Sequence, residues 1–358
     1  MFHDIILLIL GLALLVFGAN YVTDGAVSVA KRFKVSNLII GLTVVALGST
    51  MPDIVVCVES AFQNKPAMAM GEVIGANIFD LLLVVGIMGL VRPFKVDKVM
   101  RTQDLPILFI ASAALWIAGD TVLFDGAHHN VVNRSSGIML IVIFIFYMWF
   151  MILSSKNDPE SVGSDGMEDT PSSDKSSGAS SGNVGIVTAH SLKCEMKVLK
   201  SELTALRSKQ WFAWVMIAGG LTALVIGGNW VVDGASGLAL KIGMSQAMVA
   251  LTVVAIGNAL PDLVTSVTAT VKGASGIAFG NIVGSCVINA LLTVGLSALV
   301  IPLKADTIGF VDFFTLVGAS GLLWLFPLIS KNRGVGRVAG VILTLLYIAY
   351  MTFTVIRG

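Results

Sequence analysis

Two aspartates stand at matching places in two similar apolar segments, and each directly follows a proline. Asp53 follows Pro52, and Asp262 follows Pro261. A proline inside a helix removes one hydrogen bond and clashes with the carbonyl group four residues earlier, so we expect both helices to open there. A carboxylate in an apolar span is costly and marks function by default. The pair therefore predicts a cation site, because a capping role would not account for two acids in mid-span.

The next apolar segment of each half carries polar residues on one helical face. Residues four apart share a face of an α-helix. The polar residues with this spacing are Glu72 and Asp80 in the first segment, and Asn281, Ser285 and Asn289 in the second. Gly75 and Gly284 lie between them and permit close contact with a neighbouring helix. Helix packing alone explains the glycines but not the acids and amides.

The side chains gathered in these four segments are those that bind hard cations. Such ions take oxygen ligands from carboxylates, carbonyls, amides and hydroxyls. The candidate ligands are Asp53, Asp262, Asp80, Asn289, Ser49, Thr50, Asn258 and Ser285. The three cysteines form no CxxC pair, and no cluster of His and Cys indicates a soft metal.

The four segments belong to an internal repeat. With one shift of 209 residues and no gap, Pro52-Asp53 falls on Pro261-Asp262. Residues 42–46 and 251–255 both read Leu-Thr-Val-Val-Ala, and Gly75 falls on Gly284. Chance does not align so many Gly, Pro and Asp residues at one offset. The chain is therefore a duplicated unit.

The elements that position these residues are membrane-spanning helices. The chain is 56% hydrophobic and 13% charged, whereas a soluble domain has about 25% charged residues. A spanning helix needs about 20 apolar residues. Runs of this kind occur near 4–23, 37–62, 67–90, 104–120, 136–153, 211–232, 245–271, 275–300, 309–329 and 335–356. The expected fold is all-α, with about ten transmembrane helices in two five-helix repeats.

A polar segment divides the chain between the fifth and sixth runs. We predict a first transmembrane repeat at 1–153, a cytoplasmic linker at 154–210 and a second transmembrane repeat at 211–358. Residues 154–190 are rich in Ser, Gly and acids and cannot bury enough apolar area to fold. Leu and Met then recur at helical spacing from Leu192 to Leu206. This stripe predicts an amphipathic helix that lies on the membrane, packs on the protein, or supports self-association through 191–210.

The number of spans fixes the relative orientation of the two repeats. Five is odd, so the second repeat enters the membrane from the opposite side, as in many secondary transporters. With the N-terminus outside, 18 of the 23 Lys and Arg residues fall on the inner side. The positive-inside rule then places both termini outside and the linker in the cytoplasm, in a plasma or bacterial inner membrane.

These motifs resemble the alpha repeats of the calcium/cation antiporter superfamily, which includes the sodium/calcium exchangers. That family carries Gly-Thr-Ser-Leu-Pro-Glu on one helix and Gly-Asn-x-x-Gly-Ser-Asn on the next, in both halves. The matching first motifs here are Gly48-Ser-Thr-Met-Pro-Asp53 and Gly257-Asn-Ala-Leu-Pro-Asp262. The resemblance implies that the candidate ligands named above hold the transported ions, and it adds backbone carbonyls near Ala46 and Ala255. It also implies sodium/calcium exchange by alternating access.

The sequence departs from the family pattern at the site itself. Both family glutamates are aspartates, hydroxyls are missing at Ala76 and Ala259, and Glu72 stands where Asn is usual. One more acid and fewer hydroxyls leave the counter-ion open. The alternative is H⁺/Ca²⁺ or another cation/proton antiport, which a protonatable Glu72 would suit. A cation channel is the alternative of a different class, but broken helices in an inverted repeat favour a transporter.

Other classes of function find no support in the sequence. No nucleophile–base pair or phosphate-binding loop indicates an enzyme, and no motif indicates a bound cofactor. The net charge is +1, and no basic patch with interleaved aromatic residues indicates nucleic acid binding. The expected partners are the lipid bilayer and the transported calcium and sodium ions.

Overall fold

A computed structural model describes most of the chain. The described residues are 2–32, 46–120, 131–157, 210–271, 273, 275–304, 308–329 and 333–357. The first part of the second predicted span, almost all of the 154–210 linker and its predicted amphipathic helix lie outside the described residues.

The described elements are almost all helices. In chain order they are α1 (Phe2–Arg32), α3 (Ala46–Ser49), α4 (Met51–Phe62), α5 (Pro66–Ile78), the π-helix η2 (Phe79–Val84), α6 (Val85–Val91), β1 (Phe94–Lys95), the π-helix η3 (Met100–Asp104), α7 (Leu105–Gly119), β2 (Val131–Val132), α9 (Arg134–Asn157), α11 (Gln210–Ile242), α12 (Gln246–Val249), the π-helix η4 (Ala250–Val254), α13 (Ala255–Val271), α14 (Ser275–Ile288), the π-helix η5 (Asn289–Thr293), α15 (Val294–Val300), β3 (Leu303–Lys304), α16 (Phe310–Ile329), β4 (Gly334–Val335) and α17 (Arg337–Arg357).

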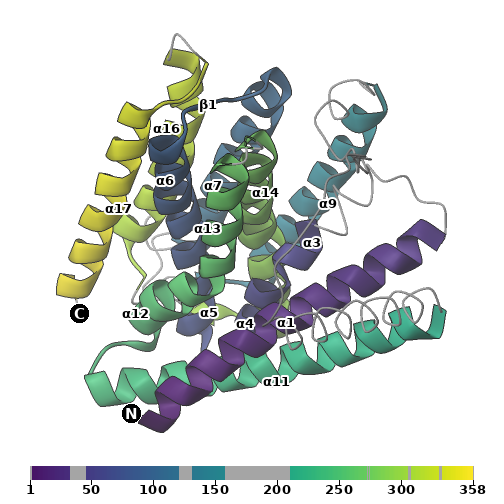
Figure 1. The fold of residues 1–358 in the computed structure, drawn as a ribbon. Coiled ribbons are helices and arrows are strands. Elements are labelled where there is room, and N and C mark those ends of the chain that lie inside the picture. Colours follow the sequence, from purple (N-terminus) through teal and green to yellow (C-terminus); the bar gives the residue numbers. More distant parts are fainter. Residues whose placement is uncertain are drawn as a thin grey trace, which may run out of the picture.

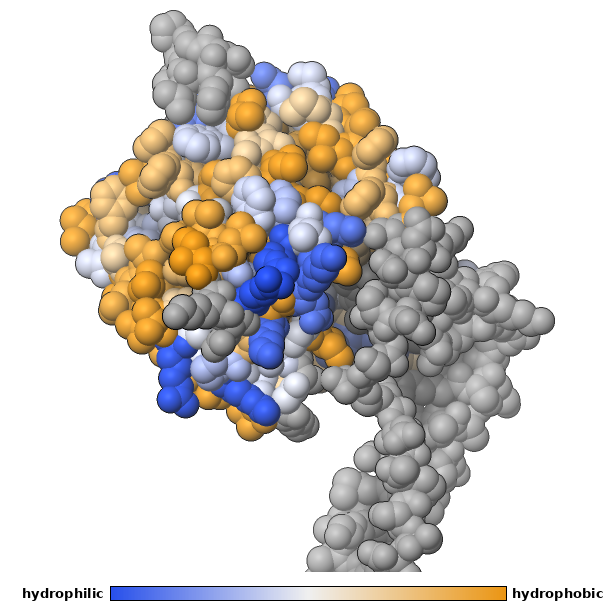
Figure 2. Space-filling view, turned by 90° about the horizontal axis from the view of Figure 1, so that it is seen from above, coloured by the Kyte–Doolittle hydropathy of each residue, from blue (hydrophilic) through white to orange (hydrophobic). Residues whose placement is uncertain are grey.

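Nine of the ten predicted spans appear as helices long and apolar enough to cross a membrane within the described residues. The remaining span, predicted at 37–62, is described only from Ala46 onward, as α3, a turn at Thr50 and α4. Large apolar side chains such as Phe146 and Trp149 face outward, as they do in lipid. Seen from the end that holds β1, a hydrophilic area lies at the centre of the face, with hydrophobic residues above it and to its left (Figure 2). The predicted all-α membrane fold is confirmed.

The twin helices α1 and α11 lie side by side along one side of the bundle (Figure 1). They pack through glycines that recur every seven residues on each helix. A Cβ atom added at Gly11 would lie 2.8 Å from the Gly227 carbonyl oxygen, and one added at Gly18 would lie 2.9 Å from that of Gly220. Residue numbers rise along one helix as they fall along the other, so the twins are antiparallel. This antiparallel contact is the direct expression of two inverted repeats.

The third and eighth spans form the centre of the bundle. The spans Pro66–Val91 and Ser275–Val300 are mostly buried, whereas few residues of the outer span Arg134–Met151 are buried. Two short antiparallel strand pairs, β1 with β4 and β2 with β3, join loops of the first half to loops of the second. The polar faces predicted on the third and eighth spans therefore lie inside protein rather than in lipid.

Only one of the two helices opens as predicted. In the first half, a turn at Thr50, two residues before Pro52, separates α3 from α4, as expected. In the second half the prediction is wrong, because α13 continues through Pro261. A proline can leave one carbonyl without its partner while the backbone stays helical. The irregularity lies instead in η4, the π-helix directly before α13.

The two central spans also change to π-helix close to candidate ligands. The π-helix η2 begins at Phe79, one residue before Asp80, and η5 begins at Asn289. Short π segments inside α-helices occur frequently at functional sites because they turn side chains away from the regular helical stripe. The sequence pattern of residues four apart did not reveal these segments.

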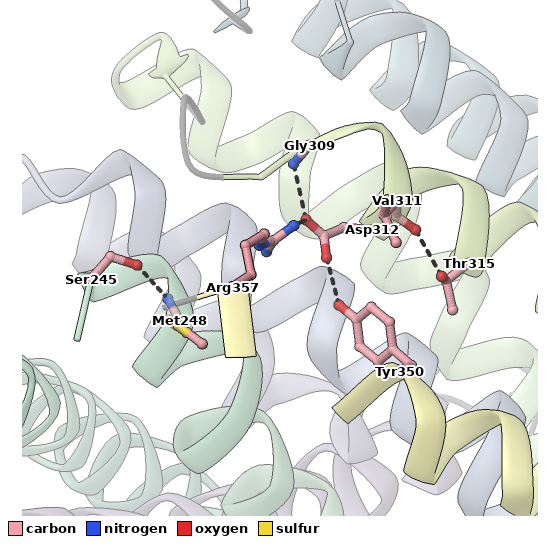
Figure 3. Close-up of polar contacts among 8 residues, drawn as sticks. All are labelled: Ser245, Met248, Gly309, Val311, Asp312, Thr315, Tyr350 and Arg357. Atoms are coloured by element: carbon pink, nitrogen blue, oxygen red, sulfur yellow. Dashed lines mark hydrogen bonds and ion pairs between the residues drawn. The ribbon is translucent and has the colours of Figure 1, made fainter. Parts of the chain in front are cut away.

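A buried carboxylate ties the start of α16 to the end of α17 (Figure 3). Asp312 is fully buried. It accepts hydrogen bonds from the Gly309 N–H at 2.9 Å and the Tyr350 hydroxyl at 2.9 Å, and it pairs with Arg357 Nη1 at 2.8 Å. Every oxygen of this buried acid therefore has a donor.

We expect Arg357→Ala to lower the free energy of unfolding by about 1–3 kcal/mol, because it leaves the buried Asp312 carboxylate without its cation. Breaking a fully buried pair costs about 3–5 kcal/mol, and the Arg357 side chain is 28% exposed, so the cost is smaller. Thermal unfolding in detergent measures it. The matched control is Arg337→Ala at the exposed start of the same helix. Equal melting of the two variants would contradict this account of the Asp312 pair.

Candidate functional site

The first contact of the site joins the two halves of the chain. Asn289 Nδ2 donates a hydrogen bond to Asp53 Oδ2 at 2.7 Å. Asp53 is half-buried in the first turn of α4, where the preceding Pro52 suits a helix start. Asn289 is fully buried, and its own Oδ1 accepts from Thr293 Oγ1 at 3.3 Å. The second and eighth spans thus meet through a carboxylate and an amide.

A second contact joins the third and seventh spans. Asn258 Nδ2 donates to Glu72 Oε1 at 3.0 Å, and Glu72 is fully buried. The Glu72 carboxyl also lies within hydrogen-bonding reach of the Asp53 carboxyl. Close packing makes this contact possible, since a Cβ atom at Gly75 would lie 2.5 Å from the Leu251 carbonyl oxygen. The predicted close approach at Gly75 is therefore present.

Two further acids lie near this pair of contacts. Asp80 is 2% exposed, and its carboxyl is within electrostatic range of both Asp53 and Asp262. Oδ1 of Asp80 has no hydrogen-bond partner among the described residues. Four acids thus share one low-dielectric region. Within the described part of the chain, no three Asp, Glu, His or Cys side chains converge as a metal-binding group, and two of the acids each accept a hydrogen bond from an amide instead.

The remaining candidate ligands lie on the same elements. Ser49 ends α3, and Thr50 in the following turn donates its hydroxyl to the Leu47 carbonyl at 3.1 Å. Ser285 donates to the Ile282 carbonyl within its own helix at 3.1 Å. Ala46 and Ala255 begin α3 and α13. The part that these hydroxyls and carbonyls play in the site stays a prediction.

One residue at the centre of the bundle was not identified from the sequence. Asn77 is fully buried and donates Nδ2 to the Cys286 carbonyl oxygen at 3.1 Å. The two positions are separated by 209 residues, which is the repeat shift itself. A residue that touches its own twin lies at the pseudo-twofold axis. The numerical match was available in the sequence, but nothing in the sequence showed that these twins, among many, would meet.

A second missed contact involves a thiol next to the site. Ser297 Oγ and Cys57 Sγ are 3.0 Å apart, and the Cys57 thiol donates to the Ala69 carbonyl at 3.4 Å. Cys57 lies one helical turn after Asp53 on α4. Cys57 and Cys286 are both buried.

Comparison with known proteins matches both predicted repeats of the chain to one protein family. The family model described as "Sodium/calcium exchanger protein" matches residues 3–153 and 212–356. The putative antiporter CaxA of Alkalimonas amylolytica is 29% identical over 96% of this chain and 96% of its own length. Inner membrane protein YrbG of Escherichia coli is 28% identical over 94% of this chain and 92% of its own length.

A further relative and a solved structure agree with that assignment. The sodium/calcium exchanger MaX1 of Methanosarcina acetivorans is 26% identical over 97% of both chains. The structure of the sodium-calcium exchanger NCX_Mj, soaked with Na⁺ and Sr²⁺, matches with a TM-score of 0.58 and 26% identity over 98% of both chains. The antiparallel repeats, the buried acids and these matches lead to one conclusion: the chain belongs to the sodium/calcium exchanger protein family, and it is a multi-pass membrane antiporter rather than an enzyme.

Proposed function

We propose that this protein exchanges Na⁺ for Ca²⁺ across the membrane by alternating access. The observation that carries the proposal is the Asp53–Asn289 contact at 2.7 Å, which unites the twin halves beside three further acids. Carboxylate and amide oxygens are the ligands of hard cations such as Ca²⁺. The name of the relative MaX1, a sodium/calcium exchanger, supports the same pair of ions.

The proposed ligands come from the second, third, seventh and eighth spans. They are Asp53, Asp80, Asp262, Asn289, Ser49, Thr50, Asn258, Ser285 and Glu72, with the backbone carbonyls of Ala46 and Ala255. The acids would supply most of the binding energy for Ca²⁺. The amides and hydroxyls would complete the coordination of Na⁺, which carries a smaller charge.

Antiport follows from the charge of such a site. Several carboxylates in a low-dielectric region repel one another strongly unless cations neutralise them. An empty site is therefore costly to carry through the bilayer centre, whereas a site loaded with one divalent cation or several monovalent cations is not. We infer that the transporter reorients only when it is loaded, so that one kind of ion leaves when the other binds.

The helices α1 and α11 are the moving part in this proposal. Among the described helices, this pair makes the most extensive contacts, and the two helices pack through glycines. Helices packed this closely move as one body. Sliding of the α1–α11 pair past the remaining helices would expose the site to each side of the membrane in turn.

The orientation and division of the chain are part of the proposal. We assign both termini to the outside and the 154–210 linker to the cytoplasm, on the excess of Lys and Arg in the inner loops. The relative YrbG is an inner membrane protein, which supports that location for this chain. The family model leaves residues 154–211 unmatched between its two segments, in agreement with a linker between repeats at 1–153 and 211–358.

The test is ion flux in reconstituted vesicles, with one gradient varied at a time. We expect an outward-directed Na⁺ gradient to drive Ca²⁺ uptake, while imposed K⁺ and H⁺ gradients of equal size have little effect. Ca²⁺ flux that ignores the Na⁺ gradient would overturn sodium coupling. Flux that ignores every gradient and fails to saturate would overturn antiport itself.

A further inference from the structure

Glu72 has one satisfied and one unsatisfied oxygen. Its Oε1 accepts the Asn258 amide at 3.0 Å. Its Oε2 has no hydrogen-bond partner among the described residues, although the side chain is fully buried. Buried polar atoms are nearly always paired, because an unpaired one forfeits its hydration without compensation. The free oxygen therefore requires either a proton shared with a neighbouring acid or a bound cation.

The neighbours of Glu72 identify the kind of partner. The Asp53 carboxyl lies within hydrogen-bonding reach of Glu72. Two carboxylates so close together in a protein interior attract a cation strongly, and two negative charges match a divalent cation better than a monovalent one. The Asn258 amide uses its nitrogen on Glu72, which leaves its carbonyl oxygen as a third ligand.

The twin positions show that this arrangement occurs on one side only. In the repeat, Asn281 occupies the position that corresponds to Glu72, and Ser49 occupies the position that corresponds to Asn258. One pseudo-symmetric face thus offers a carboxylate and an amide, and the other offers an amide and a hydroxyl. At this pair of positions the two faces differ by one negative charge, so the two positions differ in the ion charge that they favour.

We propose that Glu72 is a ligand of the transported divalent cation and sets the preference of its face of the site for Ca²⁺ over Na⁺. The proposal rests on the proposed function in taking Asp53 and Glu72 as ligands, and it assigns the choice between ions to Glu72, a residue at which this chain differs from its family. The competing account is that Glu72 only orients Asn258. The two accounts differ in whether the charge of Glu72 matters or only its hydrogen bond.

Glu72→Gln separates these accounts, because glutamine keeps an oxygen that accepts from Asn258 but removes the charge. The readout is equilibrium binding of Ca²⁺ alone to the purified full-length protein in detergent, with Na⁺ affinity measured by competition. We expect Glu72→Gln to weaken Ca²⁺ binding about tenfold or more, as ligand charge sets calcium affinity. Na⁺ affinity should change far less. Glu59→Gln, the same chemical change at an acid of α4 that is not among the proposed ligands and whose Oε1 accepts from Gln63, is the matched control and should bind Ca²⁺ as the unmodified protein does.

Two results would overturn the inference. Unchanged Ca²⁺ binding by Glu72→Gln, with weaker binding by Glu72→Ala, would reduce Glu72 to a positioning residue. Equal losses of Ca²⁺ and Na⁺ affinity would remove its role in selectivity. Both leave the proposed function standing, whereas normal Ca²⁺ binding by Asp53→Asn in the same assay would contradict the site itself. The thermal unfolding of each variant shows whether it is folded.

Discussion

Asp53→Asn should reduce Ca²⁺ transport by at least about a hundredfold while the protein stays folded. The substitution keeps the size of the side chain and an oxygen that can accept the Asn289 amide, whose bond to Asp53 measures 2.7 Å. It removes the negative charge that a divalent cation requires when it leaves water. Initial rates of Na⁺-driven Ca²⁺ uptake into vesicles measure the loss, and thermal unfolding in detergent reports the fold.

A matched aspartate separates the site from the general charge of the protein. Asp97 is exposed in the loop between β1 and η3, so Asp97→Asn makes the same chemical change far from the buried acids. It should transport normally. Asp262→Asn, the twin substitution, should fail as Asp53→Asn does. Normal uptake by either site variant would remove these aspartates from the ion pathway.

The second large effect concerns the glycine contacts between α1 and α11. A Cβ atom at Gly220 would lie 2.8 Å from the Gly18 carbonyl oxygen and 2.9 Å from the Val22 nitrogen, both backbone atoms that cannot turn aside. Gly220→Leu therefore forces the two helices apart. Overpacking a tight contact costs about 1–3 kcal/mol, and occasionally more. We expect a clear fall in melting temperature together with loss of ion exchange.

The neighbouring glycine provides the control. Gly219 is exposed, and no described atom lies within 4 Å of an added Cβ. Gly219→Leu gives the same gain in helix propensity on the same helix without the clash. It should melt at or above the temperature of the unmodified protein and exchange ions normally. If both leucine variants melted alike, the close approach of α1 and α11 would not matter for stability.

Much of the architecture could be predicted because lipid imposes simple rules. Apolar length locates the spans, and an odd number of spans in a repeated unit fixes their inversion. Prolines and glycines at one offset then located the segments that carry the buried acids. These features depend on local composition and on symmetry, both of which are visible in a single sequence.

The contacts within the site could not be predicted in the same way. The sequence indicated that Asp53 and Asn289 belong to one region, but not that they bond directly. It also did not pair Glu72 with Asn258, because such pairings depend on how far each helix is rotated. The π-helical turns at η2 and η5 alter that rotation without any distinctive residue type. Pro261 shows the reverse case. A proline predicts a break in the helix, but α13 continues through it.

The bond from Asn77 to the Cys286 carbonyl has a consequence for how a duplicated protein can treat its centre. At a twofold axis a residue meets its own copy, so two identical side chains would compete for one space. Here a side chain on one copy meets the backbone of the other, and every residue type supplies that backbone carbonyl. A single amide therefore suffices for the bond at the axis. The corresponding residue, Cys286, takes part through its backbone alone, so its side chain can be a small thiol without loss of the bond.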